Sequence, residues 1–241
     1  MAEPSKTPQP APPGESVDTC ILSFVAGFVD TCVFVALFGL FTAHVTGNFV
    51  LIGAALVHRD GDVLPKLLAL PVFVLAVAAA VKAAEALERR QRRRIPPFLY
   101  AEAALLLLAF LASTLDVPRH PSDPSALLAG MFATAAMGLQ NALMRLELAS
   151  LPSTTVMTMN VTQSAIDVVT MLSRNVDPRS DGARRDEARK RFARMWPQIC
   201  AFTAGAAAGA ASYSLAGLGA LVLPAVLCVV LAIRWGARGA G

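Results

Sequence analysis

Four polar residues lie in apolar surroundings where such side chains are rare, and their spacing repeats. Asp30 and Asn48 are 18 residues apart, and Asn141 and Asn160 are 19 residues apart. Asp30 falls inside an apolar run, where a charge costs roughly 2.5–3.5 kcal/mol on insertion scales. An acid kept at that cost serves as a proton or cation relay, as a solute ligand, or as a structural acid held by hydrogen bonds. The sequence leaves these interpretations open.

Asn48 and Asn160, the second residue of each pair, are each the last residue of a Thr-x-Asn triplet. The triplets are Thr46-Gly-Asn48 and Thr158-Met-Asn160. Thr and Asn are good N-cap residues, because their side chains accept hydrogen bonds from the first turn of a helix. A buried helix start also presents amide donors and a partial positive charge to a ligand. The triplets therefore predict two short helices that begin at membrane depth and line a site near Asp30.

Further polar residues complete the predicted site. Asn160, Gln163, Asp167 and Thr170 recur on one helical face, which would line a polar cavity. The alternative is that this face meets cytoplasmic water or another polar helix. The predicted substrate-binding residues are Asp30, Thr46, Asn48, Gln140, Asn141, Thr158, Asn160 and Asp167.

The sequence carries no recognisable catalytic or metal motif. The four cysteines form no CxxC pair, and none lies near a histidine at metal-ligand spacing. There is no Ser-His pair at a plausible spacing and no His-x-x-Glu-His motif. His44 titrates near neutral pH or makes a structural hydrogen bond, and a lone histidine favours the second interpretation. We therefore expect no enzymatic activity, no metal and no cofactor.

Composition indicates an integral membrane protein. Of 241 residues, 55% are hydrophobic and only 16% are charged, whereas soluble domains have about 25% charged residues. Residues 82–94 and 174–194 hold 6 and 8 of the 21 Lys and Arg residues. No soluble module is visible that would present them to nucleic acid. They are typical of cytoplasmic loops that follow the positive-inside bias, with contact to anionic lipid as a by-product.

The hydropathy pattern predicts an all-α polytopic membrane protein with six transmembrane helices and two short re-entrant or broken helical segments. Residues 43–57 are too few for a full crossing, and residues 154–172 are too polar to face lipid. Charge bias favours six spans with both termini cytoplasmic, and a seven-span arrangement remains an alternative. The predicted spans are residues 19–41, 64–87, 97–115, 125–145, 195–215 and 218–235.

The two halves of the chain share one order of segments. Repeat unit one covers about residues 17–115 and unit two about residues 125–236, each with a span, a short segment and two further spans. Three spans per unit make this a 3+3 inverted repeat, and such repeats place binding sites near the bilayer midplane. Residues 17–241 thus form one membrane domain, after a disordered Pro-rich tail at residues 1–16.

Glu102 and the charged stretch at residues 177–194 are interpreted as structural features. Glu102 is expected to pair with the arginines that precede it, near a cytoplasmic helix end. Residues 177–194 are expected to form an amphipathic helix on the membrane surface. Neither feature is assigned to the predicted site.

Two stretches, "AGFVDTCVFVALFGLFTAHVTGNFVLIGAAL" and "GMFATAAMGLQNALMR" with the following "STTVMTMNVTQ", resemble the YoaK-like family of bacterial inner-membrane proteins. The resemblance implies a polytopic inner-membrane protein of a family without an assigned activity. From the residues, the leading hypothesis is a transporter or channel for a small polar solute or a proton, with its site at the repeat interface. The alternative is a non-transporting membrane module that binds lipid or a partner protein. A homo-oligomer is compatible with either.

Overall fold

The computed structural model describes residues 13–58, 63–116, 119–173 and 178–238, and every element in these ranges is helical. Residues 1–12 of the predicted tail at residues 1–16 lie outside the described residues, and the first described helix begins at Pro13. The elements are α1 (Pro13–Ala36), α2 (Gly47–His58), α3 (Leu64–Arg89), α4 (Ile95–Ser113), α5 (Pro124–Leu146), α6 (Met157–Leu172), α7 (Pro178–Ala216), the 3-10 helix η1 (Gly217–Leu221) and α8 (Val222–Ala237).

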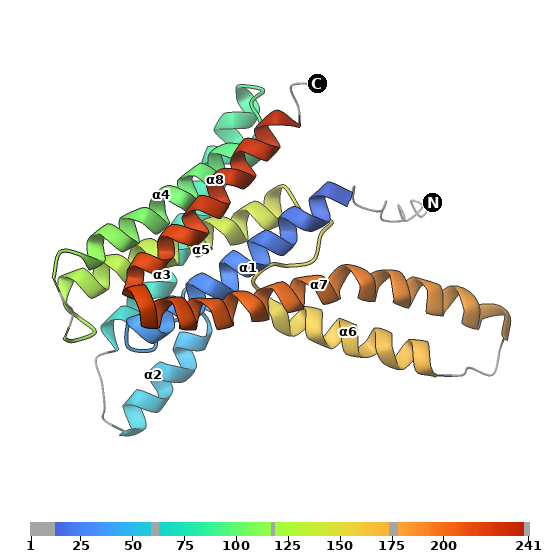
Figure 1. The fold of residues 1–241 in the computed structure, drawn as a ribbon, viewed down its shortest axis with the longest axis horizontal. Coiled ribbons are helices and arrows are strands. Elements are labelled where there is room, and N and C mark those ends of the chain that lie inside the picture. Colours follow the sequence, from blue (N-terminus) through green and yellow to red (C-terminus); the bar gives the residue numbers. More distant parts are fainter. Residues whose placement is uncertain (1–12, 59–62, 117–118, 174–177, 239–241) are drawn as a thin grey trace.

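Five helical segments in the described part of the chain are long and apolar enough to cross a membrane. The last of them, residues 182–237, contains both α7 and α8. Gly217, at the start of η1, has a φ of +57°, a backbone conformation that glycine adopts readily. The chain reverses there, so that α8 turns back from the end of α7 (Figure 1). This one segment therefore holds two helices of different direction.

Helix α7 corrects one prediction from the sequence. It has 39 residues, or about 58 Å at 1.5 Å per residue, against about 30 Å for the hydrocarbon core. The charged stretch at residues 177–194 was predicted as a separate helix on the membrane surface. It is instead the N-terminal half of α7 from Pro178 onward, continuous with the apolar half. Pro197 lies inside the helix without ending it.

The bundle is held together by close packing of helices from both halves of the chain. Helix α1 runs along α7, α3 packs on α5, and α4 packs on α5 and α8. At Gly205 of α7, a Cβ atom would lie 2.1 Å from the backbone oxygen of Phe24 in α1. Gly27 of α1 makes an equally close approach to α7. Small residues thus allow the two backbones to touch, as is common between membrane helices.

The two short helices lie outside this bundle. Helix α2 has 12 residues, about 18 Å, and α6 has 16 residues, about 24 Å, so both are short for a crossing. Helix α6 packs against α7, and the two form a hairpin that projects from the bundle (Figure 1). Helix α2 projects at another end of the molecule.

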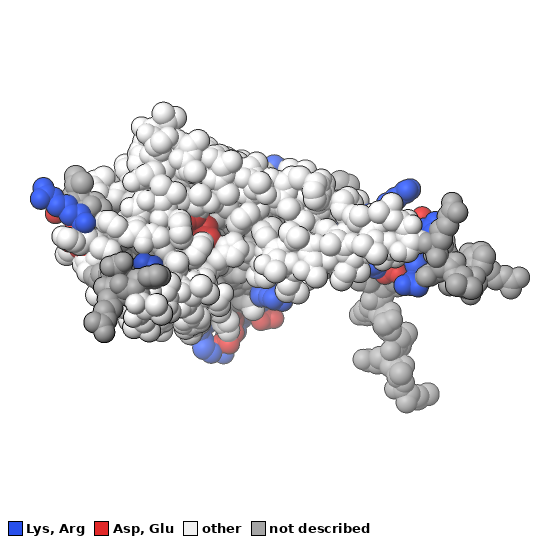
Figure 2. Space-filling view, turned by 90° about the horizontal axis from the view of Figure 1, so that it is seen from below, with Lys and Arg blue, Asp and Glu red and all other residues white. Residues whose placement is uncertain are grey.

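Basic residues meet at one end of the bundle, here called the basic end and defined by Arg93, Arg94, Arg234 and Arg238. The Arg93 side chain donates to the carbonyl of Trp235 at 3.0 Å, which joins the α3–α4 connection to the end of α8. Arg94 pairs with Glu147 after α5 at 3.2 Å, and Arg234 and Arg238 both pair with Asp18 of α1. Figure 2 shows a face that is mostly uncharged, with most charged side chains at its two ends and lower edge and an acidic side chain near its middle.

Candidate functional site

Asp30 accepts hydrogen bonds that hold the segment between α1 and α2 in place. The chain turns at Phe38 and Gly39, both with positive φ, and returns toward the inner face of α1. There Asp30 Oδ1 accepts from the Thr42 amide at 2.7 Å, the Thr42 hydroxyl at 3.1 Å and the Ala43 amide at 2.8 Å. Its Oδ2 lies 2.6 Å from His44 Nδ1. The carboxylate is buried and surrounded by donors, an arrangement that favours the structural interpretation of this acid.

Asn48 and Asn160 make matching contacts in the two halves. Asn48 binds both backbone groups of Phe41, accepting from its amide at 3.0 Å and donating to its carbonyl at 2.9 Å. Asn160 donates to the carbonyl of Ser153 at 2.8 Å. Each asparagine thus reaches a residue seven positions upstream and fixes the connection before its own helix.

The predicted capping role fails for the second triplet. Helix α6 begins at Met157, its N-cap is Val156, and no side chain makes the capping hydrogen bond. Thr158 lies within the first turn with an exposed side chain. In the first triplet Thr46 precedes α2 and is also exposed. The asparagines are therefore the residues of the two motifs that fix the backbone.

The Gln-Asn pair of α5 holds the second connection. The Thr155 hydroxyl donates to Asn141 Oδ1 at 2.6 Å. Gln140 Nε2 donates to the Thr154 hydroxyl and to the carbonyl of Leu22 in α1, both at 2.9 Å. Gln140 is fully buried, so its amide ties three separate segments together inside the protein.

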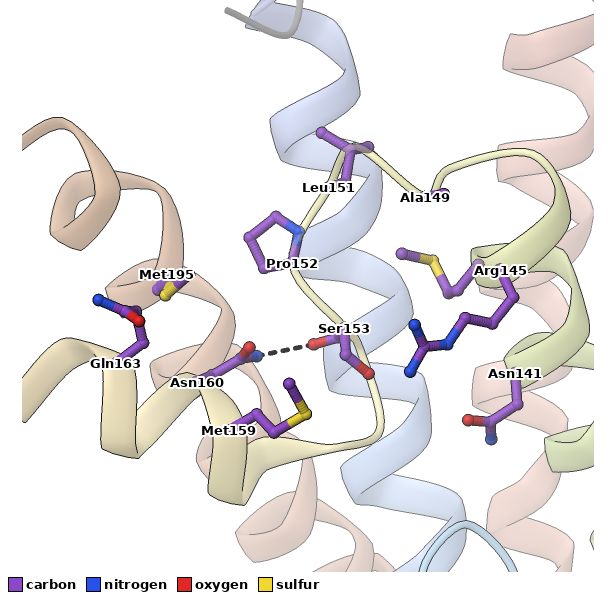
Figure 3. Close-up of a pocket in the computed structure, with 11 residues that line it drawn as sticks. Asn141, Arg145, Ala149, Leu151, Pro152, Ser153, Met159, Asn160, Gln163 and Met195 are labelled. Atoms are coloured by element: carbon purple, nitrogen blue, oxygen red, sulfur yellow. Dashed lines mark hydrogen bonds between the residues drawn. The ribbon is translucent and has the colours of Figure 1, made fainter. Parts of the chain in front are cut away.

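Between α5, the connection before α6, and α6 lies a cavity of about 270 Å³. In Figure 3, Arg145 of α5 reaches toward Ser153, while Asn160 and Gln163 lie on the opposite side on α6. Asn141 and Asn160 are the predicted site residues that line the cavity; Asp30, Thr46, Asn48, Gln140, Thr158 and Asp167 do not. All the lining residues fall between positions 141 and 195, within the second half of the chain.

Arg145 is the residue of this cavity that the sequence reasoning missed. It follows Asn141 by four positions on α5 and therefore shares its helix face. Among the described residues it makes no ion pair or side-chain hydrogen bond. The neighbouring acid, Glu147, is taken up by Arg94. The guanidinium of Arg145 thus keeps its donors available to a ligand.

Asp167 lies on the polar stripe of α6 and faces α7. Its Oδ1 accepts from Arg191 Nη2 at 2.8 Å and Nε at 3.1 Å, and from Gln163 Nε2 at 3.0 Å. Asp167 is fully buried. The stripe therefore packs on another polar helix at this residue, the alternative that the sequence left open.

Glu102 is not placed as predicted. Its side chain is fully buried in α4, and no Lys or Arg in the described part of the chain forms an ion pair with it. Glu102 lies eight residues after Arg94, about 80° away around the helix. The expected pairing with the preceding arginines is wrong, because the helix turns this carboxyl into the bundle.

The apolar helices and their packing define an integral, multi-pass membrane protein with a cavity of mixed polar and apolar lining beside the bundle. The protein family described as "Protein of unknown function (DUF1275)" matches residues 19–234, and the chain belongs to this family. No curated protein and no solved structure matches the chain.

Proposed function

We propose that the protein is a transporter or channel for a small polar solute, and that the cavity beside Arg145 is its binding site. The available guanidinium in a cavity of about 270 Å³ carries this proposal. Ligand pockets for drug-sized molecules run from about 300 to 1,000 Å³, so this volume suits a smaller solute. Arginine binds carboxylates through paired hydrogen bonds, and the amides of Asn141 and Asn160 supply further donors and acceptors.

The architecture proposed with this function is six spans in a 3+3 inverted repeat. Two sets of contacts support it. Asp30 and Asn48 hold the first connection as Asn141 and Asn160 hold the second. A Cβ on Gly27 would meet the Phe202 carbonyl of α7, and one on Gly138 would meet the Phe73 carbonyl of α3. The first span of each half, α1 or α5, thus packs on the second span of the other half, α7 or α3.

The proposed orientation places the basic end in the cytoplasm of a bacterium, with both termini on that side. Arg93, Arg94 and the C-terminal arginines all lie there. Lys190 and Arg194 of α7 lie near Ser16 of α1, at the same end. The positive-inside bias supports this orientation. The resemblance to YoaK-like proteins supports the inner membrane as its location.

The test is uptake into proteoliposomes of a panel of small carboxylates and uncharged amides, with wild type, Arg145→Gln and Arg90→Gln. Arg90 is an exposed arginine near the basic end and lies outside the cavity. A hydrogen bond to a charged group is worth about 1.5–3 kcal/mol, so Arg145→Gln should lower carboxylate uptake at least about tenfold. Arg90→Gln should retain it. Equal uptake by wild type and Arg145→Gln would contradict the assigned site.

A second candidate function is a non-transporting module that binds lipid or a partner protein. The direct backbone approach of α1 to α7, at 2.1 Å for a Cβ on Gly205, favours it. Helices packed this closely leave no path for a solute between them. Because α1 and α7 belong to different halves of the chain, this contact closes that part of the interface between the halves. The candidates differ in whether the cavity opens to both faces of the membrane.

A further inference from the structure

Glu102 differs from every other buried acid in the described part of the chain. Asp18 and Asp167 pair with arginines, and Asp30 is surrounded by donors. Both carboxyl oxygens of Glu102 are buried without a nitrogen or oxygen partner, and the residue has 0% exposed surface. In the described part of the chain, this carboxyl therefore holds no other group in place through a hydrogen bond to nitrogen or oxygen.

The carboxyl lies between α4 and α8, in a helix that is long and apolar enough to cross a membrane. It is seven residues into α4, about 10 Å from the helix start at the basic end, inside a hydrocarbon core of about 30 Å. The buried thiol of Cys228 on α8 is the titratable group that interacts with it. Thr134 of α5 lies at a similar level, ten residues after the start of its helix, while Glu102 lies eleven before the end of α4. The Thr134 hydroxyl is also buried and unpartnered in the described structure.

These surroundings decide the state of the acid. Among the described residues this carboxyl has no nitrogen or oxygen donor, and the Cys228 thiol is a weak donor. An ionised carboxylate in such apolar surroundings is so costly that the group binds a proton instead. A purely structural position would be served better by an apolar side chain of similar volume, which has no polar atoms to bury. Ionisable residues inside membrane spans mark proton and ion pathways by default.

We propose that Glu102 is a proton-binding site of the membrane domain, neutral in the structure described and able to exchange its proton with water. The carboxyl gains and loses only H⁺, so no other reactant is required. A role in coupling proton movement to solute movement rests on the proposed function. The site itself does not.

Infrared difference spectroscopy in native-like vesicles tests the proposal directly. Wild type minus Glu102→Gln should show the C=O band of one protonated carboxyl. The band should shift in D₂O and disappear as pH rises. Asp30→Asn is the matched control and should keep the band. Absence of the band, or a band unchanged by D₂O and by alkaline pH, would overturn the proposal by showing an ionised or permanently neutral acid.

A hydrophobic carbodiimide gives a second readout. The protonated carboxyl adds its O–H across the N=C=N group, and the O-acylisourea rearranges to a stable N-acylurea that peptide mass spectrometry locates. Modification is expected at Glu102, decreasing as pH rises, and it should be absent in Glu102→Gln. Modification at no pH would contradict an exchanging site. Neither experiment requires transport, so a proton site without solute uptake would refute the proposed function alone.

Discussion

The close contact between α1 and α7 at Gly27, Gly205 and Gly209, here called the seam, predicts that Gly205→Ala is destabilising. The new Cβ would lie 2.1 Å from the Phe24 oxygen, which is backbone and cannot rotate away. Even the closest contacts that real Cβ atoms tolerate are about 3.0 Å, so the helices must separate by about 0.9 Å. Gly27 and Gly209 make similar approaches along the same seam, and the separation therefore loosens its packing along several turns.

The expected cost follows from two opposing effects. Overpacking of a tight interior costs about 1–3 kcal/mol, whereas Gly→Ala in a helix gains about 1 kcal/mol. Gly182→Ala, in the same helix, supplies the matched control, because a Cβ there meets nothing within 4 Å. Gly182→Ala should be neutral or stabilising. Gly205→Ala should lie about 1–3 kcal/mol below that control in the free energy of unfolding.

The assay is thermal unfolding of the purified protein in one detergent, read by the loss of its monodisperse peak. For a chain of this size, 1 kcal/mol corresponds to roughly 2–4 °C in the midpoint. Gly205→Ala should therefore unfold several degrees below Gly182→Ala. Equal midpoints for the two variants would refute the direct backbone contact between α1 and α7.

Three further predictions concern the polar contacts. Asp30→Ala leaves the donors of Thr42 without an acceptor and should destabilise the fold by roughly 2–5 kcal/mol. Asp30→Asn keeps an acceptor and should lose less stability. Equal midpoints of the two variants in thermal unfolding would contradict this. His44 lies between α1 and α2, outside the spanning helices, and its hydrogen bond with Asp30 raises the pKa of its imidazole. The stabilisation by protonated His44 is therefore fully present below the ordinary pKa of histidine and is lost as pH rises through the raised pKa; His44→Gln should flatten this pH profile. Arg191→Gln leaves the buried Asp167 carboxylate without its charged partner and should lower the free energy of unfolding by about 3 kcal/mol, more than Asp167→Asn does. Amide hydrogen exchange of α6 measures both effects. A larger loss for Asp167→Asn would refute the assigned ion pair.

The sequence predicted the helical class and the positions of the long helices to within a few residues, except at α1 and α7. Helix α1 runs from Pro13 to Ala36, whereas the predicted span was residues 19–41. Helix α7 is longer than predicted. Its apolar pattern begins near residue 195, but the preceding Ala, Arg and Glu residues favour helix. The helix therefore extends back to Pro178. A long run of apolar residues locates a membrane span, whereas helix propensity decides how far the helix continues beyond it.

The residues that line the cavity were predicted from the sequence only in part, because they come from segments that are distant in sequence. The motif asparagines were identified, and Asn141 and Asn160 do line the cavity. The carbonyls that fix the connections carry no side-chain signal. Arg145 was recoverable from its position one helical turn after Asn141. The position of Glu102 could be predicted only from its angle around the helix relative to the preceding arginines. Nearness in sequence alone suggested an ion pair that the helix prevents.

The most direct test of a transporting function needs no knowledge of the solute. Met159 lines the cavity, and its exposed side chain makes it suitable for replacement. In a protein whose native cysteines are replaced, Met159→Cys should react with a small membrane-impermeant thiol reagent added from either face of sealed vesicles. Gln91→Cys, in the α3–α4 connection, should react from one face only. Labelling of Met159→Cys from the basic end alone would contradict transport and leave the non-transporting module as the function.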